Sequence, residues 1–281
     1  EAGAVLADIS QAPDLVTSAS GPAVVQLGGN HRSVGDVARL ADAIRDGDAE
    51  ACLALLVHSD SCSLTPFSGT ETLAELPQLA HDLEEAAQQA VTAANIGDGD
   101  LAVAALEGHR LLCAHREGPF GTGFWQAQVR RHLAATLPGY AAGPGHYPGQ
   151  PLIVTRNSDV VSNGDVAVII RAGDRLVAAV DRGDHAQPLS PLQLDATQEL
   201  HAMTIHKSQG SQFDTVSVVL PPLGSPLLTR ELLYTAITRA KTSVRLYGSP
   251  EALREAATTR ARRASGLSRS VNNDHGAGRG R

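Results

Sequence analysis

The fold is decided by residues 199–249, whose sequence is ELHAMTIHKSQGSQFDTVSVVLPPLGSPLLTRELLYTAITRAKTSVRLYGS. Alternating apolar residues predict strands over 215–220 and 244–248. Between them, apolar residues recur at helical spacing, and Thr229 is placed to cap the first turn of the predicted helix. Those apolar residues are Leu232, Leu233, Ala236 and Ile237. Two strands that bracket a helix form a βαβ unit, which indicates an α/β fold with a parallel sheet.

Polar side chains gather directly after a short apolar stretch that ends near residue 203. They belong to Thr204, His206, Lys207, Ser208 and Gln209. Gly210 follows at a point where the chain must turn. In open α/β sheets, ligands bind at the carboxyl ends of the strands. Arg239 follows the predicted helix, and a fixed guanidinium group there suits a phosphate group.

These segments resemble helicase motifs. TIHKSQGSQFD (204–214) is similar to motif V of superfamily 1 helicases, LLYTAITRAK (232–241) to motif VI, and GGNHRS (28–33) to motif IV. HKSQGS with SPLLTRELLYTAITRAK is similar to the RecD family, the alpha subunits of exodeoxyribonuclease V, and so is TRARRASGL (259–267). The resemblance spans nearly the whole chain, although its middle is matched by pattern more than by motif.

The resemblance implies an α/β fold in which a RecA-like parallel sheet is flanked by helices, as the second motor domain of a helicase. It also implies a small inserted SH3-like β-barrel. Residues 1–149 would form the first part of the motor domain, 150–195 the barrel, 196–266 the remainder and 267–281 a flexible tail. Short alternating stretches, with Asn-Gly and Ala-Gly turns between them, also predict antiparallel strands in the insertion. These stretches are 151–155, 165–171 and 175–180.

The resemblance assigns nucleotide roles to four residues. Arg32 and Arg239 would reach the γ-phosphate of ATP, while Gly210 and Gln212 would contact the nucleotide. The family usually has Glu where this chain has Gln212, and the amide lacks that charge, so nucleotide affinity would be weaker. No GxxxxGKS or GxxxxGKT phosphate loop occurs. Because the chain also begins without Met, we expect an upstream motor domain to bind most of the ATP and its Mg²⁺, and the chain alone to be inactive.

DNA contacts are implied at a second group of residues. Thr204, His206 and Lys207 would hold phosphates of single-stranded DNA, and Asn157 would add a contact from the insertion, although ordinary turn chemistry explains Asn157 equally well. In the resembled family, ATP-dependent translocation runs 5′ to 3′ from single- or double-stranded DNA ends and serves double-strand break repair and recombination. Its partners are the beta and gamma subunits (RecB-like and RecC-like), to which we assign the nuclease chemistry.

Two rival interpretations remain. One is a non-catalytic scaffold that only binds sister subunits. The other is part of a stand-alone RecD-like helicase or of the helicase domain of a conjugative relaxase. Retention of both Arg32 and Arg239 argues against the scaffold, and TRARRASGL favours the exonuclease subunit.

Composition limits the class of protein. The chain has 281 residues, 42% of them hydrophobic, which is enough to bury a sizeable core. A net charge of -7 excludes a generally basic nucleic-acid coat but leaves room for a local basic groove. Three cysteines without CxxC spacing indicate buried thiols in a reducing cytoplasmic environment, and no metal site is expected. No apolar run approaches the roughly 18 residues of a membrane span.

The sequence also predicts further helices and where some of them begin and end. Ser33 would cap a helix that ends near residue 46, and an amphipathic helix would run continuously through 73–90. Residues 123–133 would form another helix, in which we expect Trp125 to pack inside rather than stack on a DNA base. The last helix would begin at the cap Ser249 and end at Gly266.

Overall fold

The computed structural model describes residues 17–18, 21–22 and 35–261. Two short strands, β1 (Thr17–Ser18) and β2 (Gly21–Pro22), pair antiparallel in a unit separate from the main one, Arg32–Arg260, which holds the elements considered below. Arg32 and the expected tail at 267–281 lie outside the described residues.

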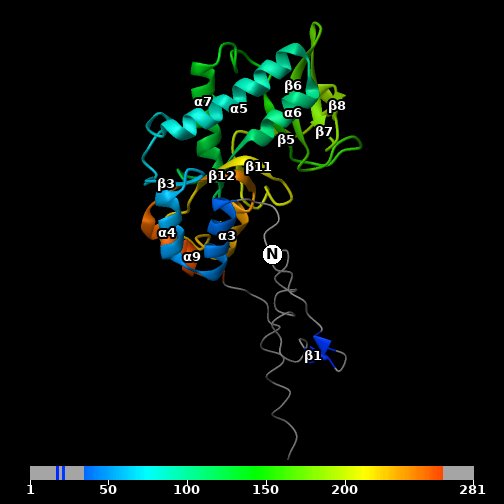
Figure 1. The fold of residues 1–281 in the computed structure, drawn as a ribbon. Coiled ribbons are helices and arrows are strands. Elements are labelled where there is room, and N and C mark those ends of the chain that lie inside the picture. The colour runs from blue at the N-terminus through cyan, green and yellow to red at the C-terminus, as the bar shows by residue number, and fades with distance from the viewer. Residues whose placement is uncertain (1–16, 19–20, 23–34, 262–281) are drawn as a thin grey trace, which may run out of the picture. The chain divides into compact units, whose positions relative to one another are not determined.

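A five-stranded parallel sheet forms the centre of the main unit (Figure 1). Its order is β10 (Met203–Thr204), β4 (His109–Cys113), β11 (Phe213–Val219), β12 (Ala240–Tyr247) and β3 (Cys62–Thr65), and every neighbouring pair is parallel. Helix α8 (Arg230–Ile237) connects β11 to its neighbour β12, so the predicted βαβ unit is confirmed. The α/β class with a parallel sheet is therefore correct.

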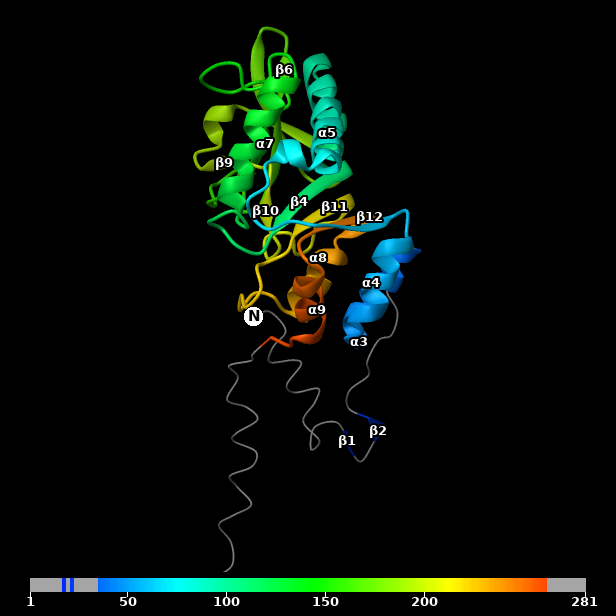
Figure 2. The same cartoon turned by 90° about the vertical axis from the view of Figure 1, so that its left-hand side faces the viewer.

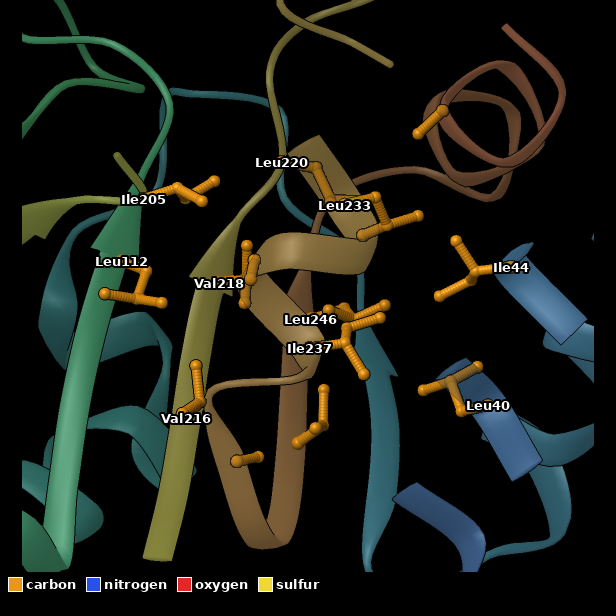
Figure 3. Packing of buried hydrophobic residues seen from close by; sticks show 14 of the residues in the cluster. Leu40, Ile44, Leu112, Ile205, Val216, Val218, Leu220, Leu233, Ile237 and Leu246 are labelled. Carbon is orange, nitrogen blue, oxygen red and sulfur yellow. The ribbon is translucent and has the colours of Figure 1, made fainter. Parts of the chain in front are cut away.

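Four helices pack against one face of this sheet: α3 (Asp36–Asp46), α4 (Ala49–His58), α8 and α9 (Pro250–Thr258). Alternate residues of the central strands, such as Val216 and Val218, lie on the side of these helices and belong to the same apolar cluster as Ile237 of α8 (Figure 3). Because side chains alternate between the faces of a strand, Ser217 faces the other way, where its hydroxyl lies 2.9 Å from the His109 ring. This alternation fixes which face each helix covers.

The other face is covered by η1 (Leu73–Glu75), α5 (Pro77–Ile96) and α7 (Thr122–Thr136). Trp125 of α7 has no exposed surface and packs against Phe67 and Phe124, whose ring centroids lie 5.6 and 5.5 Å from its own. A side chain buried this completely cannot stack on a DNA base, so the packing role expected for Trp125 is the one observed. Helix α6 (Gly99–Gly108) packs beside α5 and joins this layer to a second sheet.

That second sheet is antiparallel and is formed by residues 151–199 (Figure 2). Its order is β8 (Ala186–Leu189), β7 (Arg175–Asp181), β6 (Val166–Ala172), β5 (Pro151–Val154) and β9 (Thr197–Glu199). Val168 and Ile170 of β6 pack against α5 and α6, while Ala167 and Ile169 belong to a separate apolar cluster. The sheet therefore has an apolar layer on each face, and it contains β8 and β9 in addition to the three predicted strands.

Two predicted helix starts need correction. Helix α3 begins at Asp36 with Gly35 as N-cap, at a positive φ of 63°, and the predicted cap Ser33 lies outside the described residues. The continuous helix through 73–90 is interrupted, because α5 begins at Pro77 after the short turn η1. Proline lacks an N–H group and its ring disfavours the helical conformation at the preceding residue, Leu76.

The last helix also ends earlier than predicted. Ser249 caps α9 as expected, with its hydroxyl oxygen accepting the Ala252 N–H at 3.1 Å. The helix ends at Thr258 rather than at Gly266, because Thr259 is extended (φ -80°, ψ 120°) and its carbonyl accepts the Arg230 N–H at 2.8 Å. This bond to the first residue of α8 holds Thr259 in an extended conformation, so α9 ends before it.

The three cysteines, Cys52, Cys62 and Cys113, are buried and free. Burial raises the pKa of Cys52 to about 12, so its thiol is not poised to react near neutral pH. The described part of the chain contains no helix that is long and apolar enough to cross a membrane.

Candidate functional site

The polar residues after β10 form one compact turn, residues 204–208. Lys207 N–H donates to the Thr204 hydroxyl at 3.3 Å, and the buried Ser208 hydroxyl donates to the Ile205 carbonyl at 2.8 Å. Ile205 N–H continues the pairing with β4 through the Cys113 carbonyl at 3.0 Å. The turn therefore stands at the carboxyl end of β10, with the side chains of His206 and Lys207 exposed.

A neighbouring loop, missed by the sequence reasoning, lies beside this turn. Thr204 is in register with Cys113, the last residue of β4, so the loop that begins at Ala114 lies at the same edge of the sheet. It carries the exposed Arg116 and also His115, whose Nε2 is 3.1 Å from the Ser225 hydroxyl. The strand order β10-β4 creates this proximity, and no local sequence signal reports that order.

Gly210 and Gln212 line a pocket of about 400 Å³, together with Lys207 and Lys241. Gly210 is in the left-handed region (φ 94°), which explains why a glycine is needed at this turn. Among the described residues, the buried Gln212 Nε2 group has no hydrogen-bond partner. A buried donor left unpaired is costly, so this amide group has a hydrogen bond still to make.

Arg239 joins the end of α8 to the loop 210–212. Its Nε donates to the Thr235 carbonyl at 3.2 Å and its Nη1 to the Ser211 carbonyl at 3.1 Å, and the residue is only 8% exposed. The Thr235 carbonyl is among the last four of α8, which lack partners within the helix. The structure thus brings Arg239 to Gly210 and Gln212, with its guanidinium turned onto carbonyl groups of the protein.

Asn157 lies apart from the turn at 204–208, in the antiparallel insertion. Its Oδ1 accepts the Asn163 N–H at 2.6 Å and closes a turn. Gly164, the residue after Asn163, lines the same pocket as Gln212 and Lys207. The insertion therefore borders the candidate site, while the Asn157 side chain has a structural bond of its own.

Metal ligands are not gathered in the parts of the chain that the structure describes. No group of three or more His, Cys, Asp or Glu side chains there could hold a metal ion. The pocket that Gly210 and Gln212 line also contains the carboxylates of Glu107 and Asp181, and the Lys241 Nζ group is paired with Glu107 at 2.8 Å.

Comparison with known proteins places these residues in a family context. Residues 199–247 match the model of the UvrD-like helicase C-terminal domain. The chain is 42% identical over 269 residues to the RecBCD enzyme subunit RecD of Mycobacterium tuberculosis, covering 95% of this chain and 45% of that protein. The corresponding subunit of Mycolicibacterium smegmatis is 42% identical over 271 residues, 46% of its length.

The chain is also similar to a protein that is itself named a DNA helicase. The ATP-dependent RecD2 DNA helicase of Deinococcus radiodurans is 33% identical over 157 residues, which are 53% of this chain and 21% of that protein. The chain is thus similar to RecD over nearly its whole length, and it spans about half the length of the mycobacterial relatives.

Solved structures show a more distant likeness. The Pif1 helicase from Bacteroides in complex with ADP-AlF3 and ssDNA is 14% identical, with a TM-score of 0.41, over 90% of this chain and 57% of that one. At this TM-score the likeness carries no inference about function.

Proposed function

We propose that this chain, which is related to RecD over 95% of its length, is the second motor domain of an ATP-dependent DNA helicase. The observation that carries the proposal is the direct bond between Arg239 and Ser211, which brings the ends of the two helicase motifs together beside Gly210 and Gln212. Lys207, Lys241 and the Gln212 amide line the adjoining pocket, and such donors suit a nucleotide phosphate.

In this proposal, ATP and Mg²⁺ bind between an upstream motor domain and this one. Bound there, the Mg²⁺ would neutralise charge on the phosphates. Arg32 and Arg239 would stabilise the charge that spreads over the γ-phosphate oxygens in the transition state. Gln212 would donate its free amide N–H to the nucleotide. For Arg239 to act in this way, it has to exchange its bonds to the Thr235 and Ser211 carbonyls for bonds to phosphate when the cleft closes.

DNA would be held at the carboxyl edge of the parallel sheet. Thr204, His206 and Lys207 would contact phosphates from the 204–208 turn, and the exposed Arg116 beside that turn extends the same edge. Closing and opening of the cleft would move the strand. The antiparallel insertion, expected over 150–195 and continued to Glu199 by β9, would be the SH3-like barrel at the border of the site, with Asn157 near DNA. The motor domain would be formed by the flanking parts of residues 1–149 and 196–266, with 267–281 as its tail.

The resemblance to RecD supports a biological role. We propose 5′ to 3′ translocation from DNA ends within an exodeoxyribonuclease V-like complex with RecB-like and RecC-like subunits, acting in double-strand break repair and recombination. The match to the RecD2 helicase supports a second candidate, a stand-alone helicase that needs no such partners.

The DNA assignment is tested by replacing Lys207 with Ala in the full-length polypeptide. The affinity for single-stranded DNA should fall, and the slope of log K against log salt should become shallower by about one unit, because one phosphate contact is lost. Thr204→Ala should lower affinity with little change in slope, because its hydroxyl carries no charge. Fluorescence anisotropy across a salt series measures both quantities.

Arg254→Ala is the matched control, since Arg254 is an exposed cation on α9, on the helical face of the sheet, and pairs with Glu50. It should leave affinity and slope unchanged. If Lys207→Ala behaves like Arg254→Ala, the 204–208 turn does not hold DNA.

A further inference from the structure

The segment that joins the antiparallel sheet to β10 is held by one side-chain amide. Gln126 of α7 accepts two backbone N–H groups with its Oε1, from His201 at 2.6 Å and from Ala202 at 3.1 Å. The Nε2 of the same amide donates to the Glu199 carbonyl. A single side chain therefore satisfies three backbone groups within four residues, in the manner of a neighbouring strand.

Leu200, the remaining residue of this segment, is hydrogen-bonded through both its N–H and its carbonyl group. Leu200 N–H donates to the Pro151 carbonyl of β5 at 3.0 Å. The Leu200 carbonyl accepts from the buried guanidinium of Arg110 in β4 at 2.9 Å. The segment 199–202 is thus tied to α7, to the antiparallel sheet and to the parallel sheet at once.

The Glu199 side chain strengthens the same attachment. Arg130, one helical turn after Gln126, has its Nε 3.2 Å from the carboxylate, and Gln150 donates to it at 3.0 Å. The His201 ring nitrogen Nε2 lies 3.3 Å away. Burial alone would raise the pKa of Glu199, but the nearby His201 ring and the bond from Gln150 outweigh it and hold the pKa at about 2. The carboxylate is therefore ionised at neutral pH.

Strand β10 is short. Among the described residues it pairs with β4 alone and lies at the edge of the sheet, while Met203 of β10 and Ile205 after it pack in the core. A ladder this short contributes few bonds, so the position of the chain entering β10 depends on the segment before it. Thr204 follows Ala202 by two residues, which is too short a span to absorb a shift of that segment.

We propose that Gln126 is a positioning residue that sets where the 204–208 turn stands relative to the antiparallel insertion and so makes its DNA contacts possible. The proposal rests on the proposed function, because its readout is DNA binding. Gln126 itself touches neither DNA nor nucleotide in this scheme. It acts through the backbone of residues 199–202.

The first test is Gln126→Leu in the full-length polypeptide. Leucine keeps much of the volume but leaves the N–H groups of His201 and Ala202 unpaired, so the dissociation constant for single-stranded DNA should rise about tenfold. The turnover number at saturating DNA should stay within about twofold, because the Arg239 site is not displaced. Gln128→Leu is the matched control, since Gln128 is on the same helix and takes no part in these bonds.

The second test gives a signature that loss of stability cannot produce. In Gln126→Glu, the protonated carboxyl group still accepts from His201 and Ala202 and still donates to the Glu199 carbonyl, whereas the ionised form opposes that carbonyl and the Glu199 carboxylate. The ordinary pKa of Glu is about 4.3; the Glu199 carboxylate would raise the pKa at position 126, whereas Arg130 and the N–H groups of His201 and Ala202 would lower it. The new carboxyl group is therefore fully ionised by pH 8, and DNA affinity relative to wild type should be lower at pH 8 than at the lowest pH at which the wild type binds DNA.

Gln128→Glu is the control for this variant. The other titratable groups around position 126 are Glu199, His201, Arg130 and Tyr147, and the wild type and both variants contain all of them. Expressing affinity as a ratio to wild type at each pH therefore isolates the new carboxyl group. A flat ratio for Gln126→Glu, or a Gln126→Leu variant that melts lower yet binds DNA normally when folded, would overturn the positioning role. If wild type itself fails to bind DNA, the proposed function fails instead.

Discussion

Replacing Arg239 with Ala in the full-length polypeptide is expected to lower the turnover number for ATP hydrolysis by about 10³-fold or more, the effect expected if Arg239 is an arginine finger. Nucleotide affinity should change far less, because the charge that the guanidinium meets develops in the transition state. Arg239→Lys should recover little, since a point charge on a flexible stem does not reproduce the planar fork.

The structure decides how this variant has to be measured. Arg239 donates to the Thr235 and Ser211 carbonyls, so Arg239→Ala should also lower the melting temperature. Hydrolysis must therefore be expressed per folded molecule, by single-turnover kinetics beside a thermal melt, with Arg254→Ala as the control. A lowered melting temperature with normal hydrolysis per folded molecule would show that Arg239 only caps the C-terminal end of α8 and takes no part in catalysis.

The largest effect on stability is expected at Trp125. Trp125→Ala removes a fully buried ring packed between Phe67 and Phe124, and such truncations cost about 3–5 kcal/mol in unfolding free energy. Urea denaturation measures this value directly. A loss below about 1 kcal/mol would mean that the packing around α7 is not as described.

Trp125→Phe separates packing from DNA contact. The smaller ring still fills most of the site, and the indole N–H that it removes has no hydrogen-bond partner among the described residues. We expect a much smaller loss of stability than in Trp125→Ala and unchanged affinity for single-stranded DNA. Weaker DNA binding at equal folded fraction would show that the indole reaches DNA.

Local signals in the sequence predicted the centre of the fold. The alternation in 215–220 and 244–248 gave β11 and β12, and Thr229 and Ser249 cap α8 and α9 as expected. These predictions succeeded because caps and alternation depend on residues only a few positions apart. The helices α4 and α6, each capped by an aspartate, and the polar strands β8 and β9 carry weaker patterns and were not predicted.

Tertiary proximity could not be predicted in the same way. Gln126 is 73 positions from Glu199, and Arg116 is brought beside the 204–208 turn only by the strand order β10-β4. The orientation of the Arg239 side chain could not be predicted from the sequence either, because a guanidinium group at a helix end can bond to the last carbonyl groups or extend into solvent. Because Arg239 bonds to such carbonyls here, its retention alone argues less against a scaffold role than the sequence suggested.

The central claim is that this chain supplies the arginines and the DNA-binding edge of an ATPase whose phosphate loop belongs to another domain. The most direct measurement compares ATP hydrolysis by the full-length polypeptide and by this 281-residue chain, each with and without single-stranded DNA. We predict that the full-length polypeptide hydrolyses ATP faster when DNA is present, while this chain alone shows negligible turnover. Steady hydrolysis proportional to the concentration of this chain alone, or full-length turnover that ignores DNA, would contradict the account.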